Sequence, residues 1–94
     1  MRLDKYLKVS RLIKRRTLAK ELCDAGRVEV AGRVAKAGTE VAVGDTVAIR
    51  FGTRRLQVRI EQIAQTVGKA QAAELYTVIK DERQAQDLAE DDPS

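Results

Sequence analysis

The strongest constraint on the fold is an alternation of large apolar residues with Ala or polar residues over positions 47–51 and again over 56–61. Apolar side chains take every second position on both sides of a Gly52-Thr53 turn: Val47, Ile49 and Phe51, then Leu56, Val58 and Ile60. Because successive side chains of a strand point to opposite faces, this period of two places all six on the same face. The pattern predicts a hairpin of residues 46–51 and 56–63 with one buried face.

Two short helices are predicted before this hairpin. Near-helical spacing of Leu3, Tyr6, Leu7 and Val9 indicates a helix over residues 3–9, with Asp4 in its first turn, where the helix dipole favours an acid. A second helix is expected over residues 15–24, with apolar residues Leu18, Ala19, Leu22, Cys23 and Ala25 and a left-handed cap at Gly26. Since the first helix is too short to be stable alone, the two helices must pack on each other and on the strands after them.

The rest of the chain completes an α+β fold. Residues 28–30 and 33–34 are predicted to be extended on either side of an Ala31-Gly32 turn. Residues 69–80 begin with strong helix formers and finish with β-branched residues. We therefore expect a C-terminal helical extension, and the residue at which its helix ends is left open. We therefore divide the chain into a domain of residues 1–65, an extension over 66–80 that packs on it, and an acidic, flexible tail over 81–94.

Charge is concentrated at the N-terminal end of the chain. Residues 1–36 hold eleven Lys and Arg against four acids, a net charge of +7, whereas residues 81–94 carry a net charge of −5. Such segregation indicates a polyanionic partner for the basic part. The candidate binding residues are Arg2, Lys5, Lys8, Arg11, Lys14, Arg15, Arg16 and Lys20, followed by Arg27, Arg33 and Lys36.

The spacing of these cations suits a phosphate-binding surface. Positions 2, 5 and 8 follow one side of the first helix, and positions 16 and 20 lie one turn apart on the second. Packing the apolar faces together turns both rows outward. Arg16 is an attractive anchor, since its planar fork can bind a phosphate bidentately. If about six phosphates are neutralised, log affinity falls against log salt with a slope of about −4 to −5.

The amino-acid composition favours structured RNA as the partner and argues against an enzyme. The three aromatic residues, Tyr6, Phe51 and Tyr76, are expected in or near the core and leave almost no rings for base stacking. With no paired-aromatic RNA motif, zinc knuckle or long recognition helix, binding to structured RNA by shape is favoured, while DNA and anionic membrane stay open. No histidine and a single cysteine predict no metal site, no cofactor and no enzyme. Without a stretch of about 20 apolar residues or a signal peptide, we expect a cytoplasmic protein.

Several residues have two interpretations. Asp4 is either a helix-start residue or part of the RNA site, where it could orient Arg2 or Lys5 or reject a wrong partner. Arg27, Arg33 and Lys36 are equally consistent with RNA contacts and with ordinary strand-surface charges. A solvated surface is the favoured interpretation, over a second RNA patch, for the hairpin cations Arg50, Arg54, Arg55 and Arg59.

Four motifs together resemble a known RNA-binding domain, the one named after ribosomal protein S-four: residues 2–7 (RLDKYL), 9–11 (VSR), 15–19 (RRTLA) and 26–32 (GRVEVAG). The resemblance implies two packed helices followed by a small, strongly bent antiparallel sheet within residues 1–65. That domain accompanies catalytic domains in pseudouridine synthases and tyrosyl-tRNA synthetases, and we expect none here. The short form is similar to the stand-alone heat-shock-fifteen family, and residues 9–21 and 72–80 are similar to the RqcP family of ribosome-associated quality-control factors.

The resemblance implies a specific role. A factor of this family binds rRNA of a free large ribosomal subunit that still carries stalled peptidyl-tRNA, and supports C-terminal alanine tailing by an NFACT-family partner. Large-subunit rRNA would lie against Arg16 and its neighbours, with Arg2 and Asp4 in the functional face, and we expect a monomer. Ala31 replaces the Asn usual in the family, and because Ala tolerates positive φ poorly, the turn type is open.

Two other functions compete with this one. The first is a ribosome-biogenesis or regulatory module that binds other structured RNA and has no role in tailing. The second is an interaction module whose basic face meets an acidic protein.

Overall fold

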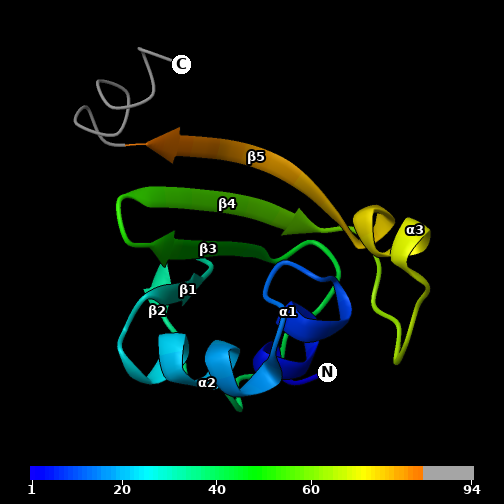
Figure 1. Cartoon of the computed structure of the whole chain (residues 1–94), viewed down its shortest axis with the longest axis horizontal. Helices are drawn as coiled ribbons and strands as arrows, with labels where there is room; N and C mark the ends of the chain where they lie inside the picture. Colours follow the sequence, from blue (N-terminus) through cyan, green and yellow to red (C-terminus); the bar gives the residue numbers. More distant parts are fainter. Residues whose placement is uncertain (84–94) are drawn as a thin grey trace.

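The computed structural model describes residues 1–83, which form an α+β fold with a five-stranded antiparallel sheet in the order β2-β1-β3-β4-β5 (Figure 1). The elements in chain order are α1 (Leu3–Val9), α2 (Arg16–Asp24), β1 (Val28–Val30), β2 (Arg33–Val34), β3 (Thr46–Phe51), β4 (Arg54–Ile60), α3 (Lys69–Ala72), the 3₁₀ helix η1 (Ala73–Leu75) and β5 (Tyr76–Arg83). The predicted pair of helices and the hairpin are confirmed, with α2 beginning one residue later and β4 spanning 54–60 instead of 56–63.

One core joins the two helices to the sheet. Helices α1 and α2 lie together beside β1 and β3, while α3 lies at the end of the sheet where β4 meets β5 (Figure 1). The alternation in residues 46–60 is confirmed, because its apolar members are buried except Phe51, which is half-buried. The apolar side chains that are at most 2% exposed are Leu3, Tyr6, Leu7, Ile13, Ala19, Cys23, Val28, Val47, Ile49, Val58, Ile60, Ala72 and Leu75.

The predicted C-terminal helical extension is wrong beyond residue 75. A helical stretch covers only Lys69–Leu75, and β5 then pairs with β4 from Ile60↔Tyr76 to Arg54↔Arg83. The physical reason is that the free edge of β4 offers backbone hydrogen-bond partners to the eight residues of β5. Three of these residues, Thr77, Val78 and Ile79, are β-branched and therefore favour a strand. Residues 81–83 of the predicted tail belong to this strand, and residues 84–94 lie outside the described part.

The Ala31-Gly32 turn is a type I′ turn, although Ala at its first position tolerates positive φ poorly. The two residues have φ values of 53° and 82°, and the positive φ at both central positions is that of a type I′ turn. Flanking residues pair as Val30↔Arg33 and Glu29↔Val34. Ala31 is exposed, so its methyl group meets solvent and the cost of the left-handed backbone is confined to the residue itself.

Candidate nucleic-acid interface

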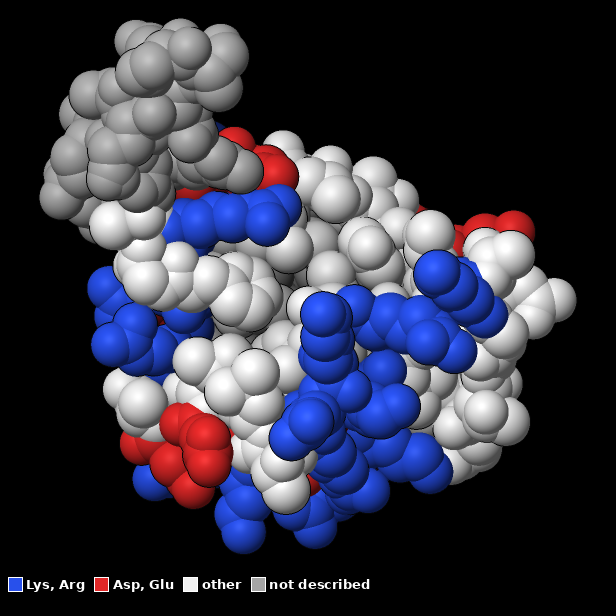
Figure 2. Space-filling view, in the orientation of Figure 1, with Lys and Arg blue, Asp and Glu red and all other residues white. Residues whose placement is uncertain are grey.

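The eight cations of residues 1–20 lie on α1 and just before it, on α2 and on the turn between the two helices. We call this set the basic surface: Arg2, Lys5, Lys8, Arg11, Lys14, Arg15, Arg16 and Lys20. All of these residues are exposed except Lys5, which is half-buried. Figure 2 shows Lys and Arg side chains gathered on the lower part of the molecule, where Figure 1 places α1 and α2. A surface of this kind can contact several phosphates of a folded nucleic acid at once.

Asp4 is the acid at the centre of this surface. Its carboxylate accepts hydrogen bonds from Arg2 Nε at 3.3 Å, from Arg16 Nε at 3.2 Å and from Arg16 Nη2 at 3.4 Å. The backbone N–H of Lys5 donates a further bond at 2.8 Å. Asp4 is 3% exposed, whereas about half of each arginine side chain stays exposed. The carboxylate therefore fixes two guanidinium groups from different segments and leaves part of each open to a ligand.

The ion pairs keep Asp4 charged. Burial raises the pKa of Asp4, but the hydrogen bond and charge of Arg16, the charge of Arg2 and the Lys5 N–H together lower the pKa below its ordinary value of 3.8. As predicted, Asp4 lies in the first turn of α1. It contacts Arg2, one of the two residues it was expected to orient, and its second partner is Arg16 and not the Lys5 side chain. A role for Asp4 in RNA binding stays a prediction.

We expect Asp4→Asn to destabilise the protein in a pH-dependent way. Because the pKa of Asp4 is lower in the folded than in the unfolded chain, its contribution is complete well above pH 4 and disappears as the pH falls through the folded-state pKa. With the two arginines half-exposed, the loss at neutral pH is about 1–2 kcal/mol in the free energy of unfolding. Urea unfolding of both proteins between pH 2 and pH 7 measures it.

Glu40→Gln, which removes an exposed carboxylate bonded to the N-terminal amine, is the control for loss of a negative charge. A stability difference between Asp4→Asn and the wild type that stays constant down to the lowest pH would contradict the ionised cluster.

The cations on and around the β1–β2 hairpin are placed differently. Arg27 precedes β1, Arg33 lies in β2 and Lys36 follows it, and all three are exposed. None of them has an ion-pair partner among residues 1–83. They are free to bind an anion, and RNA contact by these residues stays a prediction.

The hairpin of β3 and β4 carries cations whose charges are largely matched. Arg54 makes two hydrogen bonds to Asp81 at 2.8 and 2.7 Å, Arg59 pairs with Glu61 at 3.0 Å, and Arg55 lies 3.9 Å from Glu29. By contrast, on the basic surface Asp4 is the one acid within ion-pair distance of a cation, within the part of the chain that the structure describes. The geometry favours the basic surface over the hairpin as a polyanion site.

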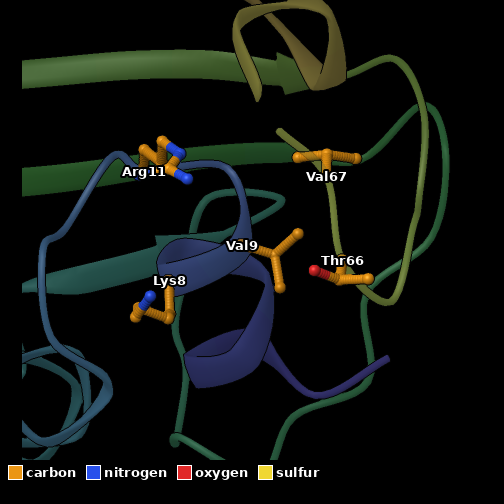
Figure 3. Close-up of a pocket in the computed structure, with 5 residues that line it drawn as sticks. All are labelled: Lys8, Val9, Arg11, Thr66 and Val67. Atoms are coloured by element: carbon orange, nitrogen blue, oxygen red, sulfur yellow. The ribbon is translucent and has the colours of Figure 1, made fainter. Parts of the chain in front are cut away.

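Two residues outside the predicted site, Thr66 and Val67, lie beside α1. They line a hollow together with Lys8, Val9 and Arg11 (Figure 3). The Lys5 ammonium also donates a hydrogen bond to the Gln65 side chain, and the buried Tyr6 hydroxyl donates to the Leu75 carbonyl at 2.8 Å. The first bond ties the segment before α3 to α1, and the second ties η1, which follows α3, to the same helix. Residues 64–68 have no regular periodicity, so no local signal predicts that they lie beside α1.

Among residues 1–83, no group of three or more His, Cys, Asp or Glu could hold a metal ion. Cys23 is buried, which raises the pKa of its thiol to about 11, so it behaves as a small core residue, as predicted. No described helix has the length and apolar character needed to cross a membrane.

Comparison with known proteins identifies relatives along most of the chain. The S4 domain matches residues 1–47. A protein of Listeria monocytogenes is 57% identical over 83 residues, which are 88% of this chain and 90% of that protein. A protein of Bacillus subtilis is 51% identical over 83 residues, 88% and 96% of the two chains. One from Halalkalibacterium halodurans is 60% identical over 82 residues, 87% and 93% of the two. All three are named RQC P-site tRNA stabilizing factor.

Solved structures share the fold. Heat Shock Protein 15 of Vibrio cholerae, whose structure is described as trimeric, has a TM-score of 0.78 and 29% identity over 99% of this chain and 90% of that one. The solution structure of the hypothetical protein HP1423 has a TM-score of 0.74 and 33% identity over 87% of this chain and 100% of that one.

Proposed function

The chain belongs to the S4-domain family of RQC P-site tRNA stabilizing factors, and we propose that it binds a large ribosomal subunit carrying stalled peptidyl-tRNA. In this role it holds the tRNA in the P site during ribosome-associated quality control. The factor acts by binding and not by catalysis, as the family indicates.

The observation that carries the proposal is the basic surface and its central acid. Six of its eight cations have no carboxylate partner among residues 1–83, and Arg2 and Arg16 share Asp4. The excess positive charge therefore faces solvent, as binding to RNA phosphates requires. Because the cations come from two helices and the turn between them, they can reach phosphates separated along a folded RNA, which suits recognition by shape.

Within this surface Arg16 is the proposed anchor on large-subunit rRNA. Asp4 accepts from its Nε and Nη2, which orients the guanidinium plane before RNA arrives. A side chain that is already oriented loses less conformational entropy on binding. Arg2 is fixed by the same carboxylate, so a single acid positions two phosphate ligands. This assigns Asp4 a positioning role in RNA binding.

We further propose that an NFACT-family partner adds a C-terminal alanine tail to the stalled chain while this protein holds the tRNA. The family name supports the P-site tRNA part of this scheme. A cytoplasmic location is part of the proposal, since large ribosomal subunits work there. A monomer also remains a prediction, and analytical ultracentrifugation of the purified chain decides between it and a trimer such as that described for Heat Shock Protein 15.

A deletion strain tests the function. Without the gene, alanine tails on stalled chains should be lost, and a plasmid copy of the wild-type gene should restore them. An Arg54→Ala copy, which lacks an arginine outside the basic surface, should restore them equally well. Mass spectrometry of a stalled reporter protein measures the tails. Unchanged tailing in the deletion strain would contradict the proposal and favour a structured-RNA-binding module of ribosome biogenesis or regulation.

A further inference from the structure

A small hollow lies between the C-terminal end of α1 and the segment that precedes α3 (Figure 3). Its volume is about 100 Å³, and it is lined by Lys8, Val9, Arg11, Thr66 and Val67. Pockets for drug-sized ligands and cofactors measure roughly 300–1,000 Å³, so this one is too small for them. A lining with two cations, one hydroxyl and no acid suits a small anion.

The lining comes from two parts of the chain that are distant in sequence. Lys8, Val9 and Arg11 belong to residues 1–47, which match the S4 domain, whereas Thr66 and Val67 lie beyond that match. In Figure 3, Lys8 and Arg11 lie on one side of Val9 and the 66–67 segment lies on the other. The hydrogen bond between the Lys5 and Gln65 side chains holds that segment against α1.

The backbone of Arg11 is in an unfavourable conformation. Its φ is +62°, in the left-handed region that glycine occupies far more easily, and its N–H donates to the Lys8 carbonyl at 3.0 Å to end the helix. Glycine at this position would relieve the strain. The chain instead has an exposed arginine beside the hollow, and strained non-glycine residues concentrate at functional sites.

We propose that this hollow binds one phosphate group of an RNA backbone. Lys8 and Arg11 supply the positive charge, and the Thr66 hydroxyl donates a hydrogen bond to a phosphate oxygen. Lys8, Arg11 and Thr66 are exposed, so a backbone phosphate reaches them from solvent, while half-buried Val9 and Val67 limit the access of water. The inference rests on the proposed function and extends its RNA interface from the two helices to the segment before α3.

Thr66→Val is the discriminating variant, because it keeps the shape and charge of the site and removes only the hydroxyl. Its affinity for purified large ribosomal subunits carrying P-site tRNA should fall about tenfold, the loss expected for one hydrogen bond to a charged group. Arg11→Gly should also bind more weakly, with a melting temperature no lower than that of the wild type. Lys69→Gln, which removes an exposed cation on α3 that does not line the hollow, should bind as the wild type does.

The outcomes separate this inference from the proposed function. If Thr66→Val binds as the wild type does while Arg16→Ala binds weakly, the phosphate site is wrong and the proposed function stands. If both variants bind as the wild type does, both are wrong. A large drop in the melting temperature of Arg11→Gly would mean that Arg11 is structural, and would overturn its assigned role.

Titration of the free protein with inorganic phosphate distinguishes the two sources of the anion. We expect only weak shifts of the Thr66 and Arg11 amide resonances, because an isolated phosphate lacks the neighbouring contacts that RNA makes with the basic surface. Tight binding of inorganic phosphate together with an unchanged subunit affinity of Thr66→Val would identify a free-phosphate site and contradict RNA binding there.

Discussion

The Arg16→Ala variant should bind large ribosomal subunits about 10- to 100-fold more weakly than the wild type. The arginine fork can make two charge-assisted hydrogen bonds to one phosphate, and a loss of about 1.5–3 kcal/mol corresponds to this range of affinity. Arg16→Lys should give an intermediate loss, since it keeps the charge without the fork. Equilibrium binding of labelled protein to purified subunits that carry P-site tRNA measures the effect.

The contact between Arg16 and Asp4 means that Arg16→Ala should also lower the stability of the folded protein. An exposed cation without a partner can be removed with little change in the melting temperature. Arg16 donates two hydrogen bonds to buried Asp4, however, so its removal leaves that carboxylate with Arg2 and the Lys5 N–H alone. We expect a loss of about 1 kcal/mol, which lowers the melting temperature of a domain of this size by about 4–8 °C.

A matched control separates the two effects. Arg54 also makes a two-point ion pair, with Asp81, and it lies on β4 outside the basic surface. Arg54→Ala removes the same charge and a similar pair, so it should lose some stability and keep its affinity for the subunit. Equal losses of affinity in the two variants would mean that Arg16 acts only through net charge or through folding.

Salt should weaken binding more than any single substitution. With about six phosphates neutralised and a slope of −4 to −5, raising the salt from 50 to 200 mM should lower the affinity roughly 250- to 1,000-fold. The physical cause is that each phosphate contact releases counterions from the RNA, and salt opposes that release. Binding curves at four or five concentrations of potassium chloride give the slope.

A charge-removing variant checks that the slope arises on the basic surface. Lys20→Gln, on the exposed side of α2, should make the slope shallower by about one, whereas Arg54→Ala should leave it unchanged. A slope near zero in the wild type would mean that binding depends on apolar or other uncharged contacts and not on RNA phosphates.

Sequence periodicity was sufficient where each element carried its own signal. The alternation in residues 46–60 predicted the β3–β4 hairpin, and the spacing of Leu3, Tyr6 and Leu7 predicted α1. Strand β5 was missed because residues 69–75 favour a helix locally, while the partner that makes 76–83 a strand, the edge of β4, lies distant in sequence. Tertiary pairing decided there against local propensity.

Only part of the candidate site could be predicted from the sequence, because some of its contacts also join residues that are distant in the chain. The exposed cations of residues 1–20 could be read from composition and spacing, because solvent-facing charge on a short amphipathic helix is a local property. The Asp4–Arg16 contact spans twelve positions and depends on how α1 packs against α2, so no spacing rule gives it. Thr66 joins the surface through the contact of Gln65 with Lys5 across sixty positions, which only the folded structure shows.

We propose that the basic surface attaches this protein to large ribosomal subunits. Sucrose-gradient sedimentation of cell lysates, with the tagged protein detected in each fraction, tests it most directly. The wild type and Arg54→Ala should sediment with the large-subunit peak, and Arg16→Ala should shift to the top of the gradient. A wild-type protein found only at the top, or an Arg16→Ala variant that stays in the large-subunit peak, would contradict the claim.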